Sequence, residues 1–125
     1  MRSVLLDTCI LIDYLNGVSS AADTLKKYTG NSAISVITWI EVMVGAFRLD
    51  QERQQVTRHF MARFTQLPVS EAVAELAATI RAQHGIKLPD AIIDATAQIE
   101  SRLLLTRNVK DFKNTPGVIF PYTVE

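Results

Sequence analysis

The sequence contains a single cysteine, Cys9, and no long hydrophobic run. One cysteine cannot form an internal disulfide, which favours a reducing compartment, and we expect a cytoplasmic protein. No apolar run reaches the roughly 18 residues that a membrane span needs. Asp7 interrupts the first apolar stretch, so the start of the chain is unlike a secretory signal. We therefore expect no contact with a membrane.

The chain also lacks internal repeats, low-complexity tracts and linkers rich in proline, glycine or serine. Its length suits one sizeable core, and we expect a single domain over residues 1–125. Hydrophobic residues make up 48% of the sequence and charged residues 21%, which is ordinary for a globular protein and too apolar for disorder.

A net charge is absent as well, because 13 basic side chains balance 13 acidic ones. An even balance argues against a nucleic-acid binder, whose surface is usually basic. Five acidic residues, however, form a candidate cluster: Asp7, Glu41, Asp90, Asp94 and Asp111. Without these five, eight acidic residues face 13 basic ones, an excess of about +5. Charge therefore permits an RNA substrate without demanding one.

Apolar runs of strand length alternate with helical patterns along the chain. We expect strands over residues 2–6, 32–36, 66–69, 103–106 and 118–121, and helices over 8–16, 20–28, 38–49, 51–64, 71–84 and 89–101. Val56, Phe60 and Phe64 recur at helical spacing and predict one buried face. The alternation predicts an α/β fold with a parallel sheet covered on both faces, in which ligands gather outside the carboxyl ends of the strands.

Four of the acidic residues each stand at the edge of an apolar segment: Asp7, Glu41, Asp90 and Asp111. Lone acids among apolar residues are unfavourable unless something positive pairs with them, and a shared divalent cation is the simplest common partner. Asp7 and the segment 106–111 directly follow predicted strands, so the four acids can converge at one edge of the sheet. This pattern indicates metal-dependent chemistry on a phosphate-containing substrate.

Two of these acids also have a structural explanation as helix caps. Asp7 can be the N-cap of the helix that follows it, although Thr8 could equally provide the cap and leave Asp7 to a metal. Thr38 could cap the next helix, with Glu41 folding back in a capping box. The sequence leaves these alternatives open.

Asp90 and Asp94 are four residues apart, which makes them neighbours on one helix face, where like charges repel. The helix dipole explains Asp90 at a first turn. It does not explain Asp94, for which a cation or a hydrogen-bond network is needed.

The segment after the fourth predicted strand is rich in polar groups. Asn108 and Asp111 are favoured in turns, which is the structural alternative for both. Thr106 and Asn108 could hydrogen-bond a carboxylate, a water or a phosphate, and Arg107 could clamp phosphate or be solvated.

The remaining reactive residues carry weaker signals. His59 and His84 lack the spacing of metal ligands, and we expect them at the surface or in an interface. Cys9 lies in an apolar context and is expected to be a small core residue.

Four motifs, in this order, resemble the PIN-domain nucleases, and in particular the VapC-type toxins of type II toxin–antitoxin modules. They are Leu5–Ile12, Ile40–Gly45, Pro89–Ala97 and Leu105–Phe112. The resemblance implies a three-layer α/β/α sandwich with a central parallel sheet. It also implies a Mg²⁺- or Mn²⁺-dependent endoribonuclease, commonly homodimeric and held inactive by a cognate VapB-type antitoxin.

The resemblance also assigns roles to residues. The catalytic and metal-binding acids would be Asp7, Glu41, Asp90 and Asp111. The supporting residues would be Thr8, Asp94, Thr106 and Asn108. The last polar position of the family can be carried by Asn108 or Asp111, and Asp94 stands where many relatives have a small residue. The implied reaction is in-line attack of water on an RNA phosphodiester.

Two other functions fit parts of the pattern. A PIN-like module could bind RNA or protein without catalysis, although the complete acidic set argues against it. A receiver-type signalling domain has similar length and sheet architecture, but it needs an adjacent acidic pair after the first strand, where Asp7 stands alone.

Overall fold

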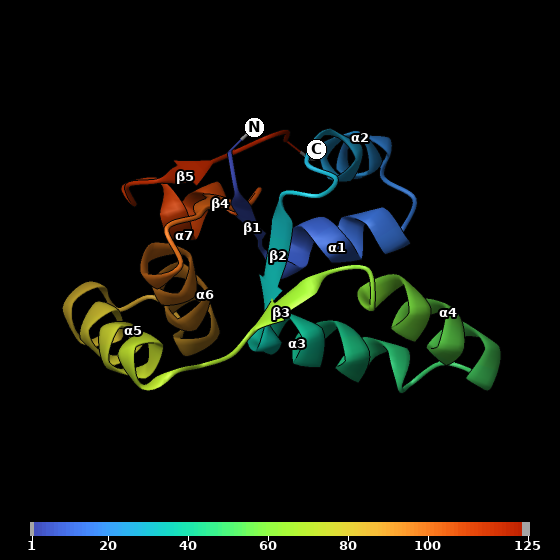
Figure 1. Ribbon diagram of the computed structural model, residues 1–125, viewed down its shortest axis with the longest axis horizontal. Helices are drawn as coiled ribbons and strands as arrows, with labels where there is room; N and C mark the ends of the chain where they lie inside the picture. Colours follow the sequence, from blue (N-terminus) through green and yellow to red (C-terminus); the bar gives the residue numbers. More distant parts are fainter. Residues whose placement is uncertain (1, 124–125) are drawn as a thin grey trace.

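The computed structural model describes residues 2–123, which form a parallel sheet of five strands flanked by helices (Figure 1). The strands are β1 (Val4–Leu6), β2 (Ser32–Ser35), β3 (Thr65–Leu67), β4 (Leu103–Leu105) and β5 (Val118–Ile119). The helices are α1 (Thr8–Leu15), α2 (Ser19–Lys27), α3 (Val36–Ala46), α4 (Gln51–Met61), α5 (Glu71–His84), α6 (Leu88–Ile99) and α7 (Val109–Phe112). The predicted α/β fold with a central parallel sheet is confirmed.

The order of the strands determines where a ligand can bind. The sheet runs β3-β2-β1-β4-β5, and every neighbouring pair is parallel. From the central β1 the chain builds outward to β2 and β3 on one side, and later returns to add β4 and β5 on the other. In a parallel sheet the point where the strand order reverses opens a crevice at the carboxyl ends, here between β1 and β4.

Alternating side chains of the strands divide the core into two layers. Val4, Leu6 and Leu105 pack on one face of the sheet, together with residues of α1, α2, α3 and α4. Leu5 and Leu104 point to the other face, against α6 and α7. Helix α5 packs outside α6, as Figure 1 shows. The β1–β4 register pairs Leu6 with Leu105, so both strands end together at the crevice.

Helix α3 begins two residues earlier than the sequence pattern predicts. The Ser35 hydroxyl accepts the Ile37 N–H at 3.1 Å and is the N-cap. Thr38 therefore lies inside the first turn and is fully buried. The alternative of a capping box between Thr38 and Glu41 is therefore wrong, which leaves the Glu41 carboxylate available for another role.

The buried face of α4 also differs from the prediction. Phe60 is buried and stacks on Tyr14 of α1, with ring centroids 4.8 Å apart, and Phe64 packs edge-on against Phe60. Val56 is instead 61% exposed, because the helix is rotated so that Thr57 and Met61 face the core. None of the helices within residues 2–123 is long and apolar enough to cross a membrane.

Replacing Ile93 by alanine tests the packing of α6 on the sheet. Ile93 is fully buried, so the cavity left behind should lower the free energy of unfolding by about 2–5 kcal/mol. Ile99 lies on the same helix but is 42% exposed, and its change to alanine should cost no more than about 0.5 kcal/mol. Urea unfolding of both variants measures the difference, and equal losses would contradict this arrangement.

Candidate functional site

Asp7 occupies the crevice between β1 and β4 and is only 4% exposed. One carboxylate oxygen accepts the Thr8 N–H at 2.8 Å, so Asp7 itself is the N-cap of α1, and the alternative cap by Thr8 is wrong. The other oxygen accepts the Thr106 hydroxyl at 2.7 Å. Because Thr106 follows β4, this bond joins the ends of the two central strands. Asp7 is thus a cap that also faces the crevice.

Glu41 reaches the same place from α3. Its Oε1 accepts the Thr8 hydroxyl at 2.7 Å, and the Thr8 oxygen lies 3.0 Å from that of Thr38. Since Thr8 gives its proton to Glu41, Thr38 is the donor in the second contact. The two threonines therefore aim Glu41 at the start of α1, beside Asp7.

Asp90 lies in the first turn of α6, and its pKa is shifted by its surroundings. Its pKa is raised from 3.8 to about 7, first by burial and then by a hydrogen bond with Asp111. The charges of Asp7, Asp111 and Glu41 raise the Asp90 pKa further. All four predicted acids therefore act on one another at one edge of the sheet.

Asp111 stands on α7, a short helix that the sequence pattern did not reveal. Asn108 caps this helix: its side-chain oxygen accepts the Asp111 N–H at 3.3 Å, and its amide donates to the Asp111 carboxylate at 2.9 Å. The Asn108 hydrogen bond is the main cause that lowers the Asp111 pKa, followed by that of Asp90. Asp90 and Asp111 can thus share one proton, held by Asp90. Asn108 and Asp111 both belong to the site, rather than one in place of the other.

Thr106 connects the two halves of the cluster. Its hydroxyl donates to Asp7 and accepts the Asn108 N–H at 3.0 Å. The side chain is fully buried, and the backbone N–H of Thr106 bonds to the Ile119 carbonyl of β5. Thr106 is therefore fixed by the sheet and in turn orients both Asp7 and the turn that leads to Asp111.

The chemistry of the donor set fits a divalent cation of the Mg²⁺ type, which prefers oxygen ligands. Within residues 2–123 no three Asp, Glu, His or Cys side chains converge closely enough to form a ready-made metal cage. Mg²⁺ is commonly held by one or two carboxylates and keeps several waters, so a looser arrangement suits it. The mutual repulsion that raises the Asp90 pKa is the observation that calls for added positive charge.

Asp94 is buried, and its Oδ1 accepts the Gln98 amide at 3.1 Å rather than a bond from one of the four acids. It lines a cavity together with His84 and with Asp111 of the cluster. Burial raises the Asp94 pKa, and hydrogen bonding to Gln98 and the charge of His84 oppose that rise. Within residues 2–123 no hydrogen bond joins Asp94 to the four acids, so no such contact supports the role expected for it. Gln98 supplies the hydrogen bond that the buried Asp94 carboxyl group requires.

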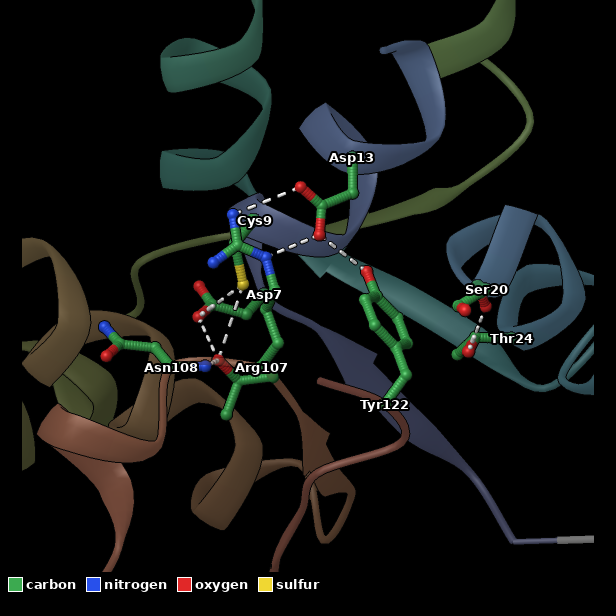
Figure 2. Close-up of polar contacts among 9 residues, drawn as sticks. Asp7, Cys9, Asp13, Ser20, Thr24, Arg107, Asn108 and Tyr122 are labelled. Carbon is green, nitrogen blue, oxygen red and sulfur yellow. Dashed lines mark hydrogen bonds and ion pairs between the residues drawn. The ribbon is translucent and has the colours of Figure 1, made fainter. Parts of the chain in front are cut away.

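Arg107 is paired with a residue that the sequence analysis did not consider, although its side chain remains 35% exposed. Its Nε and Nη2 donate to the two oxygens of Asp13 at 2.5 and 3.1 Å, and the Tyr122 hydroxyl donates to Asp13 at 2.9 Å (Figure 2). The sequence analysis missed Asp13 and Tyr122. Asp13 is a lone acid in the apolar stretch Ile10–Leu15, the same signal that identified the other four acids.

Cys9 is half-buried and contacts the site, where we expected a core residue. Its thiol donates to Asp7 at 3.5 Å. Burial and the charge of Asp7 raise the Cys9 pKa to about 11, so the sulfur stays protonated at neutral pH and serves as a donor rather than a nucleophile. His59 and His84 are exposed, as predicted.

Comparisons of the sequence and of the structure with known proteins agree with one another. A profile of the PIN domain matches residues 4–118. Ribonuclease VapC10 of Mycobacterium tuberculosis is 35% identical over 128 residues, covering 97% of this chain and 94% of that protein. Ribonuclease VapC19 of the same organism is 33% identical and covers 94% of this chain and 98% of its own. A solved toxin–antitoxin complex from Klebsiella pneumoniae contains a chain with a TM-score of 0.91 and 44% identity, covering 98% of this chain and all of that one.

The raised pKa of Asp90 predicts how the metal-free protein responds to pH. A carboxyl group with a raised folded-state pKa stabilises the fold fully below its ordinary value of 3.8, and this contribution is lost as the pH rises through about 7. Asp90→Asn removes the penalty, so its melting temperature should exceed that of the wild type increasingly from about pH 5 to about pH 8. Asp23→Asn, on the exposed face of α2, is the control and should give a constant difference. A constant difference for Asp90→Asn would contradict the crowding of charge.

Proposed function

Because this chain belongs to the PIN domain family, we propose that it is a Mg²⁺- or Mn²⁺-dependent endoribonuclease that hydrolyses RNA phosphodiester bonds, the toxin of a toxin–antitoxin pair. The observation that carries the proposal is the meeting of four carboxyl groups at the β1–β4 crevice, where the charges of Asp7, Asp111 and Glu41 add to burial in raising the Asp90 pKa. The names of the relatives, which are ribonucleases, support the choice of RNA as substrate. We propose that residues 1–125 act as one domain and that the protein is cytoplasmic.

In this proposal Asp7, Glu41, Asp90 and Asp111 hold the metal, directly or through water. When bound, the cation supplies positive charge that acidifies an attacking water and stabilises the charge that builds up on the phosphate. Thr106 keeps one oxygen of Asp7 oriented, since it donates to that oxygen at 2.7 Å. Preorganised ligands of this kind lower the cost of reaching the reactive geometry.

The supporting residues fix the other two sides of the site. Thr8 donates to Glu41 and its backbone N–H binds Asp7, so it sets the spacing between these two carboxylates. Asn108 donates to Asp111 and lowers the Asp111 pKa, which keeps that carboxylate ionised. The proton that Asp90 holds against Asp111 leaves when a cation takes its place.

A groove beside Glu41 supports the proposal of an antitoxin partner. This groove lies between α1, α3 and α4, has a volume of about 870 Å³, and is lined by Ile12, Leu15, Leu49 and Val56 among others. These four side chains are between 38% and 61% exposed. An apolar segment of a VapB-type antitoxin laid in the groove would bury them and reach the acidic cluster. The similar Klebsiella pneumoniae chain comes from a toxin–antitoxin complex.

A second apolar surface supports the proposal of a homodimer. Ile40, Val44 and Phe47 follow one another on one face of α3 and are 46%, 46% and 50% exposed. Met43 of α3 and Phe60 of α4 are buried within the chain. The proposed contact between two copies therefore uses the outer face of α3 rather than the large residues of α4.

Replacing Asp7 by asparagine tests the proposed activity. The change keeps shape but removes the charge of a metal ligand, so cleavage of total RNA with Mn²⁺ should be lost while the melting temperature is maintained or raised. EDTA should abolish cleavage by the wild type, and Asp23→Asn on the exposed face of α2 should cleave normally. Undiminished cleavage by the Asp7 variant, or by the wild type in EDTA, would overturn the proposal.

A further inference from the structure

The guanidinium of Arg107 is clamped along one edge. Two of its nitrogens bind the two oxygens of Asp13, whose side chain is only 7% exposed. The Tyr122 hydroxyl donates to the same carboxylate at 2.9 Å and holds it from the other side. Asp13 belongs to α1, Arg107 to the turn between β4 and α7, and Tyr122 to the last described segment. Three distant parts of the chain thus fix the orientation of the Arg107 guanidinium.

The third nitrogen of this guanidinium, Nη1, makes no hydrogen bond to any residue from 2 to 123. The Arg107 side chain is 35% exposed, so solvent or a ligand can reach it. Arg107 stands between Thr106 and Asn108, which bind Asp7 and Asp111, respectively. In Figure 2 the guanidinium lies between Asp13 and the carboxylate of Asp7. Burial raises the pKa of Asp7, and hydrogen bonds, chiefly from Thr106, together with the charge of Arg107 oppose that rise. A donor without a protein partner therefore sits beside the acidic cluster.

The charge of the site explains why a positively charged side chain is needed beside it. Four carboxyl groups repel a phosphodiester that approaches them, and any metal they bind is largely neutralised by those same groups. Lys87 and Lys110 act on Asp111, but both are exposed and belong to the outer rim. Arg107 is instead held by a bidentate ion pair, so little freedom is lost when it binds a ligand.

Resting on the endoribonuclease function proposed above, we propose that Arg107 binds a phosphate of the RNA next to the scissile bond through Nη1, and that Asp13 and Tyr122 are the positioning residues that aim it. Arg107 forms a charge-assisted hydrogen bond to a non-bridging phosphate oxygen. In this contact no covalent bond forms or breaks and no proton is transferred. The contact holds the phosphate against the carboxylate cluster. The competing explanation is an ion pair that only fastens α1 to the turn before α7.

A matched set of variants separates substrate binding from folding. Arg107→Gln alone leaves Asp13 buried without its partner, and loss of folding would then explain any loss of activity. The double variant Asp13→Asn with Arg107→Gln replaces both charges by amides that can still hydrogen-bond each other, and melting curves should show it folded. Arg2→Gln, an exposed arginine at the opposite end of β1, is the control for loss of one positive charge.

Two measurements on RNA 20-mers of random sequence test the proposal. With Mn²⁺, kcat/KM of the double variant should fall by about 10²–10³, as for removal of one fixed donor to a reacting group, while Arg2→Gln should match the wild type. In an inactive Asp7→Asn background, fluorescence anisotropy should show that the double change lowers the slope of log affinity against log salt by about 0.7, the value for one lost phosphate contact on a single strand. If the ion pair is only structural, the double change will leave this slope unaltered.

The outcomes distinguish this inference from the proposed function. A wild-type protein that cleaves none of the RNA overturns the endoribonuclease itself. If the wild type cleaves RNA and the double variant has an unchanged kcat/KM or an unchanged salt slope, only the proposed role of Arg107 is overturned. If the double variant does not fold, Arg107→Lys decides, since it keeps a positive charge beside Asp13 but lacks the planar guanidinium that binds Asp13 along one edge and presents Nη1 to a phosphate. A wild-type kcat/KM and salt slope in Arg107→Lys would then refute the proposal.

Discussion

Repulsion among carboxyl groups at the end of β1 and β4 is the interaction around which this molecule is organised. Asp7, Glu41, Asp90 and Asp111 come from four separate segments. Burial, the hydrogen bond with Asp111 and the charges of the other three acids together raise the pKa of Asp90 to about 7. Such crowding is unfavourable for the metal-free fold, and proteins accept it mainly where the site has a function. The rest of the chain supplies the packing and the hydrogen bonds that hold these groups in place.

The fold opposes the repulsion with rigid elements. β1 and β4 are buried on both faces, and their register brings Leu6 and Leu105 to the same level, so the residues that follow them are adjacent. The Thr106 hydroxyl then bonds directly to Asp7, and Thr8 bonds to Glu41. Asp7 and Glu41 are thus each held by a donor from another segment, and Asp111 is held by Asn108 of its own turn. A cation that replaced the shared proton of Asp90 and Asp111 would convert the repulsion into binding energy.

Much of this arrangement could be predicted from the sequence, because it follows from local pattern. The apolar runs 4–6 and 103–105 identified the strands, and Asp7 directly after the first run identified the site. The parts that could not be predicted depend on contacts between distant segments. Ser35 rather than Thr38 caps α3, and the rotation of α4 that exposes Val56 is set by the stacking of Phe60 on Tyr14.

The same reason explains why the orientations within the site escaped the sequence analysis. Asp90 and Asp94 share a helix spacing that places them on one face, yet Asp94 bonds Gln98 beside His84 while Asp90 turns to Asp111. The pairing of Arg107 with Asp13 spans 94 residues of sequence, and no local rule connects them. Sequence spacing therefore predicted candidate residues for the chemistry, and the fold decided which of them meet.

The most direct test of the account is to count the protons released when Mn²⁺ binds. Calorimetric titration of the metal-free protein, repeated at about pH 6 in two buffers of different ionisation enthalpy, gives this number. Because the pKa of Asp90 is about 7, we expect a proton to leave as the cation enters at that pH, and the release to fade above about pH 8. Binding of Mn²⁺ with no proton release at about pH 6, or no binding at all, would contradict the claim that the four carboxyl groups form one cation site.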